Sequence, residues 1–115
     1  IYGSYSNEML LNKKATSVFN YQFNHCLLKF NNSSNLFTND PLYKFETDAT
    51  HYSGIILNKD PKFFKVNQNQ LYIDNTSAAF AKGNLSYLIP LDILGTSRTL
   101  PPDLGAYQNK AFPKK

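Results

Sequence analysis

Residues 100–108, which read Leu-Pro-Pro-Asp-Leu-Gly-Ala-Tyr-Gln, say most about the fold of this chain. The two adjacent prolines end any helix and remove two backbone donors. Asp103 favours a turn, and Gly105 lies between apolar neighbours, where a residue without Cβ suits a close backbone approach. Only a basic tail follows. The stretch therefore predicts a final strand that closes a core.

Length and composition favour one domain built mainly of strands and turns. The chain has 115 residues, of which 42% are hydrophobic, with eight Tyr, nine Phe and no Trp. These numbers suffice for one aromatic-rich core. Asn occurs fourteen times, and Asn suits turns better than helix interiors. Runs of strong helix formers are rare, so an α-helical protein is not expected.

The chain carries a formal charge of +4 and has a pI near 9.2. An excess of this kind favours acidic partners such as an acidic polysaccharide, a nucleic acid or an anionic surface. The basic residues are mostly scattered, however, which is typical of a solvated surface. No helix-turn-helix, zinc-finger or RNP-like pattern occurs, so nucleic acid is not an expected partner. No apolar stretch approaches the length of a membrane span.

The sequence offers no cofactor or metal motif. Cys26 is the single cysteine and lies in an apolar run, so a buried structural thiol is expected rather than a nucleophile. The two histidines and the cysteine lie too far apart in sequence for metal-ligand spacing. A glycine-rich phosphate loop is absent. We therefore expect neither a cofactor nor a metal.

Short strand-like runs alternate with turn clusters along the chain. Residues 18–23 alternate apolar and polar side chains, residues 31–35 form an Asn- and Ser-rich loop, and residues 55–57 and 71–74 are further strand candidates. Residues 76–81 could form one helical turn. The pattern predicts an all-β fold, and by itself it leaves a small β-sandwich and a β-solenoid open.

Five motifs in a fixed order narrow this choice. They are Asp60-Pro61-x-Phe63, Asn69-x-Leu71-Tyr72-Ile73, Thr76-Ser77-Ala78-Ala79, Asp92-Ile93-Leu94-Gly95-x-x-Arg98-Thr99 and Pro102-Asp103-Leu104-Gly105-Ala106-Tyr107. This order resembles the C-terminal end of secreted right-handed parallel β-helix proteins of the pectate-lyase-like superfamily, common in gut Bacteroides-type bacteria. The chain departs from the family pattern at Ala78, where proline is usual, and at Gln108, where glutamate is frequent.

The resemblance implies the last coils and the C-terminal cap of a single-stranded β-solenoid. We expect residues 1–57 to form terminal coils and residues 58–115 to form the capping segment, as one structural domain. The chain is then a piece of a longer protein that is secreted or displayed on the bacterial outer membrane or cell surface. The rest of that protein would pack on the N-terminal coil, whose exposed edge could also pair with another copy.

The resemblance also frames the functional hypotheses. The first is a non-catalytic part of a protein that binds or processes a polysaccharide, acidic or neutral. The second is an enzyme, in which this chain contributes to a polysaccharide lyase or glycoside hydrolase site, and the third is a surface adhesin or stalk. Tyr21, His25 and Lys29 are the candidate groove residues, since each can transfer a proton. His51 is interpreted as a loop residue, and Arg98 is expected to pair with an aspartate.

Overall fold

The computed structural model describes residues 1–114 and divides the chain into two compact units, unit 1 (residues 1–58) and unit 2 (residues 59–115). The described part contains no α-helix, only two-residue strands, single 3₁₀ turns and long stretches of turn and coil. The expectation of a β-type chain without α-helices is thus confirmed. Within residues 1–114 we find no helix that is both long and apolar enough to cross a membrane.

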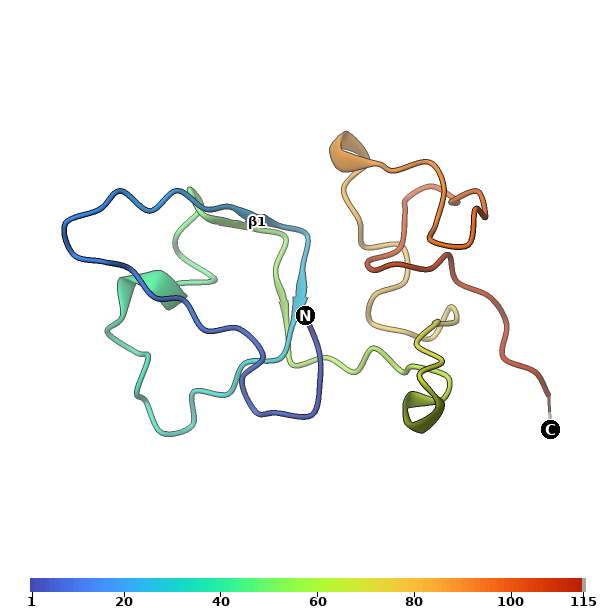
Figure 1. The fold of residues 1–115 in the computed structure, drawn as a ribbon, viewed down its shortest axis with the longest axis horizontal. Coiled ribbons are helices and arrows are strands. Elements are labelled where there is room, and N and C mark those ends of the chain that lie inside the picture. The colour runs from blue at the N-terminus through green and yellow to red at the C-terminus, as the bar shows by residue number, and fades with distance from the viewer. Residues whose placement is uncertain (115) are drawn as a thin grey trace. The chain divides into compact units, whose positions relative to one another are not determined.

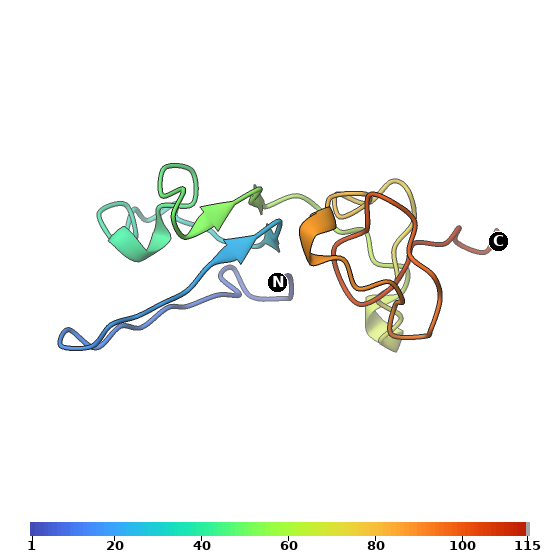
Figure 2. The same ribbon diagram turned by 90° about the horizontal axis from the view of Figure 1, so that it is seen from above.

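Unit 1 is built on two parallel strand pairs. β1 (Phe23–Asn24) pairs with β3 (Tyr52–Ser53), and β2 (Leu27–Leu28) pairs with β4 (Ile56–Leu57). Figure 2 shows β1, in blue, lying beside β3, in green. In both pairs the partners are 29 residues apart in sequence. The intervening chain carries one 3₁₀ turn, η1 (Pro41–Tyr43), whose start is capped by the side chain of Asp40.

The two paired segments bend at equivalent positions. His25 follows β1 with a φ of 50°, and Gly54 follows β3 with a φ of 62°. In each segment one further residue precedes the next strand. The two segments therefore bend at equivalent positions. A Cβ on Gly54 would lie 2.8 Å from Nδ1 of His25, so glycine is required here both by conformation and by space.

The N-terminus of the chain adds to the same arrangement. The amino group of Ile1 donates to the carbonyl of Leu27 at 2.7 Å, and the amide of Lys29 donates to the carbonyl of Ile1 at 3.1 Å. These two bonds are the parallel-strand pattern about Leu28. Three segments therefore lie side by side, with Ile1, Leu28 and Leu57 aligned across them.

The core of unit 1 is small and rich in rings. Met9, Leu28 and Tyr52 form its buried centre, and Leu28 is only 1% exposed. The ring of Phe23 stacks on that of Tyr52, with centroids 5.8 Å apart and planes 11° apart. Phe45 meets Tyr52 edge-on at 4.9 Å. The stacked strands thus align large apolar side chains, which is what holds this unit together.

Within residues 59–114, unit 2 contains two 3₁₀ turns, η2 (Val66–Gln68) and η3 (Leu85–Tyr87), and apart from isolated bridges the rest is turn, bend and coil. Residues 71–74, expected as a strand, are coil flanked by the isolated bridge between Lys65 and Gln70. Residues 76–81 form turns rather than a helical turn. Regular structure is shorter here than local patterns predict, because the backbone amides of unit 2 bond to scattered turn carbonyls and side chains and not along paired strands.

Two buried carboxylates, Asp92 and Asp103, each accept at least two of these backbone bonds. Asp92 accepts from the amides of Leu94, Thr96 and Gln108, each at 2.8 Å. These hydrogen bonds, with that of Gln108 the largest contribution, hold the pKa of Asp92 below its ordinary value. Asp103 accepts from the amide of Ala81 and from the amide and side chain of Asn109.

The closing segment, residues 100–108, was expected as a final strand but is bend and coil, because its amides bond to separate partners such as the carbonyl of Ala79 and the carboxylate of Asp92. The other expectations for this segment are partly corrected. Arg98 donates to the carbonyls of Gly105 and Tyr107 and not to an aspartate, because both aspartates are occupied by backbone amides. Gly105 has a φ of 110° and open space around its Cα, so its conformation, not a close approach, calls for glycine. The close approach occurs at Gly83, where a Cβ would lie 2.8 Å from the carbonyl oxygen of Pro102.

Candidate functional site

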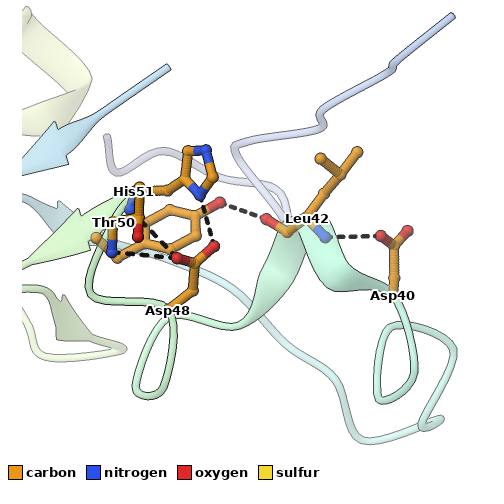
Figure 3. A network of polar contacts seen from close by, with 6 residues as sticks. Asp40, Leu42, Asp48, Thr50 and His51 are labelled. Atoms are coloured by element: carbon orange, nitrogen blue, oxygen red, sulfur yellow. Dashed lines mark hydrogen bonds and ion pairs between the residues drawn. The ribbon is translucent and has the colours of Figure 1, made fainter. Parts of the chain in front are cut away.

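The most developed polar centre of unit 1 is a carboxylate–imidazole pair. Nδ1 of His51 lies 2.6 Å from Oδ2 of Asp48, and the two residues are three apart in a tight turn. Oδ1 of Asp48 also accepts from the amides of Thr50 and His51, at 3.2 and 3.3 Å. Figure 3 shows this fan of contacts around the carboxylate. The turn forms because an aspartate readily accepts bonds from amides two and three residues ahead.

The pair has a defined protonation pattern. The hydrogen bond from His51 is the main cause that lowers the pKa of Asp48, so the carboxylate stays ionised and accepts. Nδ1 of His51 then donates in this contact, and in the tautomer that carries its single proton there Nε2 is the acceptor. A side chain so arranged can accept a proton or a hydrogen bond from a ligand hydroxyl. About a third of the His51 side chain is exposed, at 30%.

Aromatic rings hold this imidazole from one side. The ring of Tyr21 stacks on that of His51, with centroids 4.1 Å apart and planes 18° apart. Phe19 lies 4.9 Å from Tyr21, and Tyr52 meets Tyr21 edge-on at 5.8 Å. The hydroxyl of Tyr52 donates to the carbonyl of Leu42 (Figure 3), and burial is the main cause that raises the pKa of Tyr52. Tyr52 therefore remains a neutral structural donor.

These groups open onto a pocket of about 300 Å³, at the small end of the range of ligand sites. Its lining combines rings and apolar side chains with a few charges: Lys13, Phe19, Tyr21, Asp40, Pro41, Leu42, Asp48 and His51. Strand pairing brings Tyr21 near His51, because β1 begins two residues after Tyr21, β3 begins one residue after His51, and Phe23 pairs with Tyr52. The pocket therefore depends on long-range contacts within unit 1.

Of the three groove residues expected from the sequence, only Tyr21 lines this pocket. His25 lies at the corner after β1, with Nδ1 2.6 Å from the side-chain oxygen of Asn24. Lys29 donates to the carbonyl of Gly3 at 3.0 Å, and its ammonium lies 5.5 Å from the centroid of the Tyr2 ring. The structure therefore does not bring the three residues together.

Sequence reasoning missed Asp48 and His51 as a pair. His51 was interpreted as a loop residue, and it does lie in a turn, but with a structural role for its imidazole. The available signal was the spacing of an aspartate three residues before a histidine, Asp48-Ala49-Thr50-His51, which permits a side-chain bond within one turn. That spacing is common in sequences. It indicates a site only together with the stacking of Tyr21 on His51, which the structure shows.

The geometry defines a class of site: an ionised carboxylate that orients an imidazole, at the edge of an aromatic pocket in a β-type unit. Within residues 1–114, no group of three or more His, Cys, Asp or Glu side chains is placed to hold a metal ion. Comparison with known proteins adds no name, since no family model, no curated protein and no solved structure matches this chain.

Proposed function

We propose that this chain is the C-terminal part of an exported right-handed parallel β-helix protein whose body binds polysaccharide. The alignment of Ile1, Leu28 and Leu57 in parallel rungs is the observation that carries the proposal. Parallel rungs 27 and 29 residues apart fit coils of nearly constant length. The ordered motifs of residues 60–107, and their likeness to the ends of secreted β-helix proteins, support it independently.

The details of unit 1 favour a solenoid over a small sandwich. Sandwiches are built from antiparallel strands, whereas both strand pairs of unit 1 are parallel. The left-handed corners at His25 and Gly54 recur at the same place in consecutive turns, as stacked coils require. Under this proposal unit 2 is the cap, in which side chains rather than further strands satisfy the backbone.

The pocket beside His51 is the proposed sugar site. Sugar rings present flat C–H faces that pack on aromatic rings and hydroxyls that need polar partners, and this pocket offers both. Phe19 and Tyr21 supply rings, while Asp48 and His51 supply polar atoms. Two carboxylates and one lysine line the pocket, so it suits neutral sugar hydroxyls better than an acidic polymer. No catalytic role is needed for such binding.

Replacing Tyr21 with alanine is expected to weaken sugar binding about tenfold or more, since an aromatic contact and the support of His51 are lost together. Binding is measured on a panel of neutral and acidic oligosaccharides by chemical-shift changes of the Thr50 and His51 amides. Phe19→Ala, at the same pocket, is expected to act in the same direction with a smaller effect.

Tyr5→Ala is the matched control, because Tyr5 lies in unit 1 but is 76% exposed and outside the pocket lining. It should leave both folding and sugar binding unchanged. Binding by the original chain to a protein partner but to no glycan would contradict the proposal and favour an adhesin. Equal sugar binding by the Tyr21 and Tyr5 variants would show that the pocket is not the sugar site.

The second candidate function is enzymatic, and the Asp48–His51 pair favours it. Nε2 of a histidine held in this way is the form that accepts a proton as a general base. In a polysaccharide lyase the base removes the proton beside the uronate carboxylate, and in a hydrolase it activates water. Lys13 in the same pocket could face a uronate carboxylate. This candidate keeps the site of the first proposal and adds chemistry to it.

His51→Ala is expected to lower turnover about 100-fold or more in the intact exported protein, a much larger loss than the weakening of substrate binding. Cleavage is scored by reducing ends and by the ultraviolet absorbance of unsaturated products. His25→Ala, which alters the other histidine outside the pocket, should leave turnover unchanged. If no polysaccharide is cleaved, or if the His51 variant cleaves normally, the enzymatic candidate is discarded and simple binding stands.

A further inference from the structure

The net charge of the chain resides in unit 2. Residues 1–58 carry four basic and four acidic side chains, whereas residues 59–115 carry eight basic and four acidic ones. The scattered appearance of the basic residues along the sequence conceals this division. Any attraction to anionic partners therefore belongs to the second unit and not to the aromatic pocket of the first.

In residues 75–108 the basic and acidic side chains are equal in number, but folding places them at different depths. The charged residues of this stretch are Lys82, Asp92, Arg98 and Asp103. Both acids are turned inward, at 8% and 5% exposure, and accept backbone and side-chain N–H groups. Lys82 is exposed and Arg98 partly so. The surface of the stretch thus shows positive charge without exposed carboxylates.

The same stretch exposes a dense series of large apolar side chains. Between η3 and the closing segment, seven of them are at least half exposed, namely Leu85, Tyr87, Ile89, Leu91, Ile93, Leu94 and Leu100. Five of the seven occur at every second position from residue 85 to residue 93. Figure 1 shows this segment, in orange, at one end of unit 2. Exposed apolar side chains at this density are what an interaction surface offers.

We propose that residues 82–100 of unit 2 dock on an anionic lipid surface. Apolar side chains that project from turns can enter the boundary between headgroups and acyl chains, where no complementary pocket is needed. Tyrosine, present at position 87, suits that boundary with its apolar ring and polar hydroxyl. Lys82 and the net charge of the unit supply the attraction to anionic headgroups.

The charges and the apolar side chains together favour a lipid surface over the other candidate partners for this face. A second copy would bring the same positive unit against itself, and like charges oppose that contact. An acidic polymer would satisfy the charges but leave the aliphatic side chains in water. Only a partner with both anionic groups and an apolar layer matches both features. The proposal does not depend on the sugar site of unit 1.

The test is flotation of the full chain with vesicles of equal parts phosphatidylglycerol and phosphatidylcholine, compared with phosphatidylcholine alone. The chain is expected to float with the anionic vesicles and to be released by high salt. The double substitution Ile89→Ser and Ile93→Ser should lower the partition coefficient at least about tenfold. Lys82→Gln should lower it about fivefold. These side chains are exposed, so folding is expected to be retained.

Val18→Ser with Leu36→Ser is the matched control, since both residues are at least 78% exposed but lie in unit 1. This variant should float like the original chain. Three outcomes would overturn the proposal: no flotation with anionic vesicles, equal flotation by the unit 2 and unit 1 variants, or retention on an immobilised acidic polysaccharide without vesicle binding. The last outcome would assign the face to acidic polymers instead.

Discussion

Leu28→Ala is expected to lower the free energy of unfolding of unit 1 by about 3 kcal/mol. Leu28 is the most deeply buried large side chain of the described residues, at 1% exposure. It lies in β2 between the segments of Ile1 and Leu57, so its loss leaves a cavity between all three. Because the buried centre of unit 1 is small, few other buried side chains can offset the lost packing.

Hydrogen exchange measures this effect within unit 1. The amides of Ile56 and Asn58 donate to the carbonyls of Cys26 and Leu28, so they report on the pairing of β2 and β4. Their protection should fall about 100-fold in the Leu28 variant. Leu36→Ala, at a position 78% exposed in the same unit, is the control and should leave protection unchanged. Equal protection in both variants would show that the aligned rungs do not carry the stability of the unit.

Asp103→Ala is expected to destabilise unit 2 by about 3 kcal/mol. The carboxylate of Asp103 is 5% exposed and accepts three hydrogen bonds, at 2.8 Å each, from Ala81 and Asn109. Alanine would leave two partly buried backbone donors without this acceptor. Those two amides come from parts of the unit far apart in sequence, so the loss separates segments that no strand pair holds together.

Urea unfolding, followed by the exchange of the Ala81 and Asn109 amides, tests this prediction. Asp103→Asn should fall between alanine and the original residue, because only one of its two side-chain atoms still accepts. Asp60→Ala is the control, since Asp60 is exposed and its carboxylate accepts the amide of Lys62, and it should cost about 0.5 kcal/mol. A control that costs as much as the Asp103 variant would refute the special role of the buried carboxylate.

The two proposals assign separate tasks to the two units. Unit 1 offers an aromatic pocket whose polar atoms suit sugar hydroxyls. Unit 2 offers apolar and positively charged side chains that suit an anionic lipid surface. Each task is tested by its own variants. Loss of sugar binding in the Tyr21 variant should leave vesicle binding intact, and the reverse holds for the Ile89 and Ile93 variant.

The candidate site was predicted only in part from the sequence. Tyr21 was identified because it can transfer a proton and lies in an alternating run. His25 and Lys29 were chosen on the same chemical ground, yet they lie apart from the pocket. Chemistry of a side chain can be read from one residue, whereas membership of a site depends on its neighbours in space. Those neighbours are 27 to 30 residues away along this chain, at Asp48 and His51.

The sequence by itself determined the composition-level properties: no α-helix within residues 1–114, a β-type chain rich in turns, and a positive charge. These follow from local preferences of Asn, Pro, Gly and aromatic residues, which act over a few positions. Only the tertiary structure decided that Tyr21 stacks on His51 and that Asp92 and Asp103 turn inward. Both outcomes depend on contacts between distant segments, in which the burial of one group is fixed by the hydrogen bonds and packing that another segment supplies.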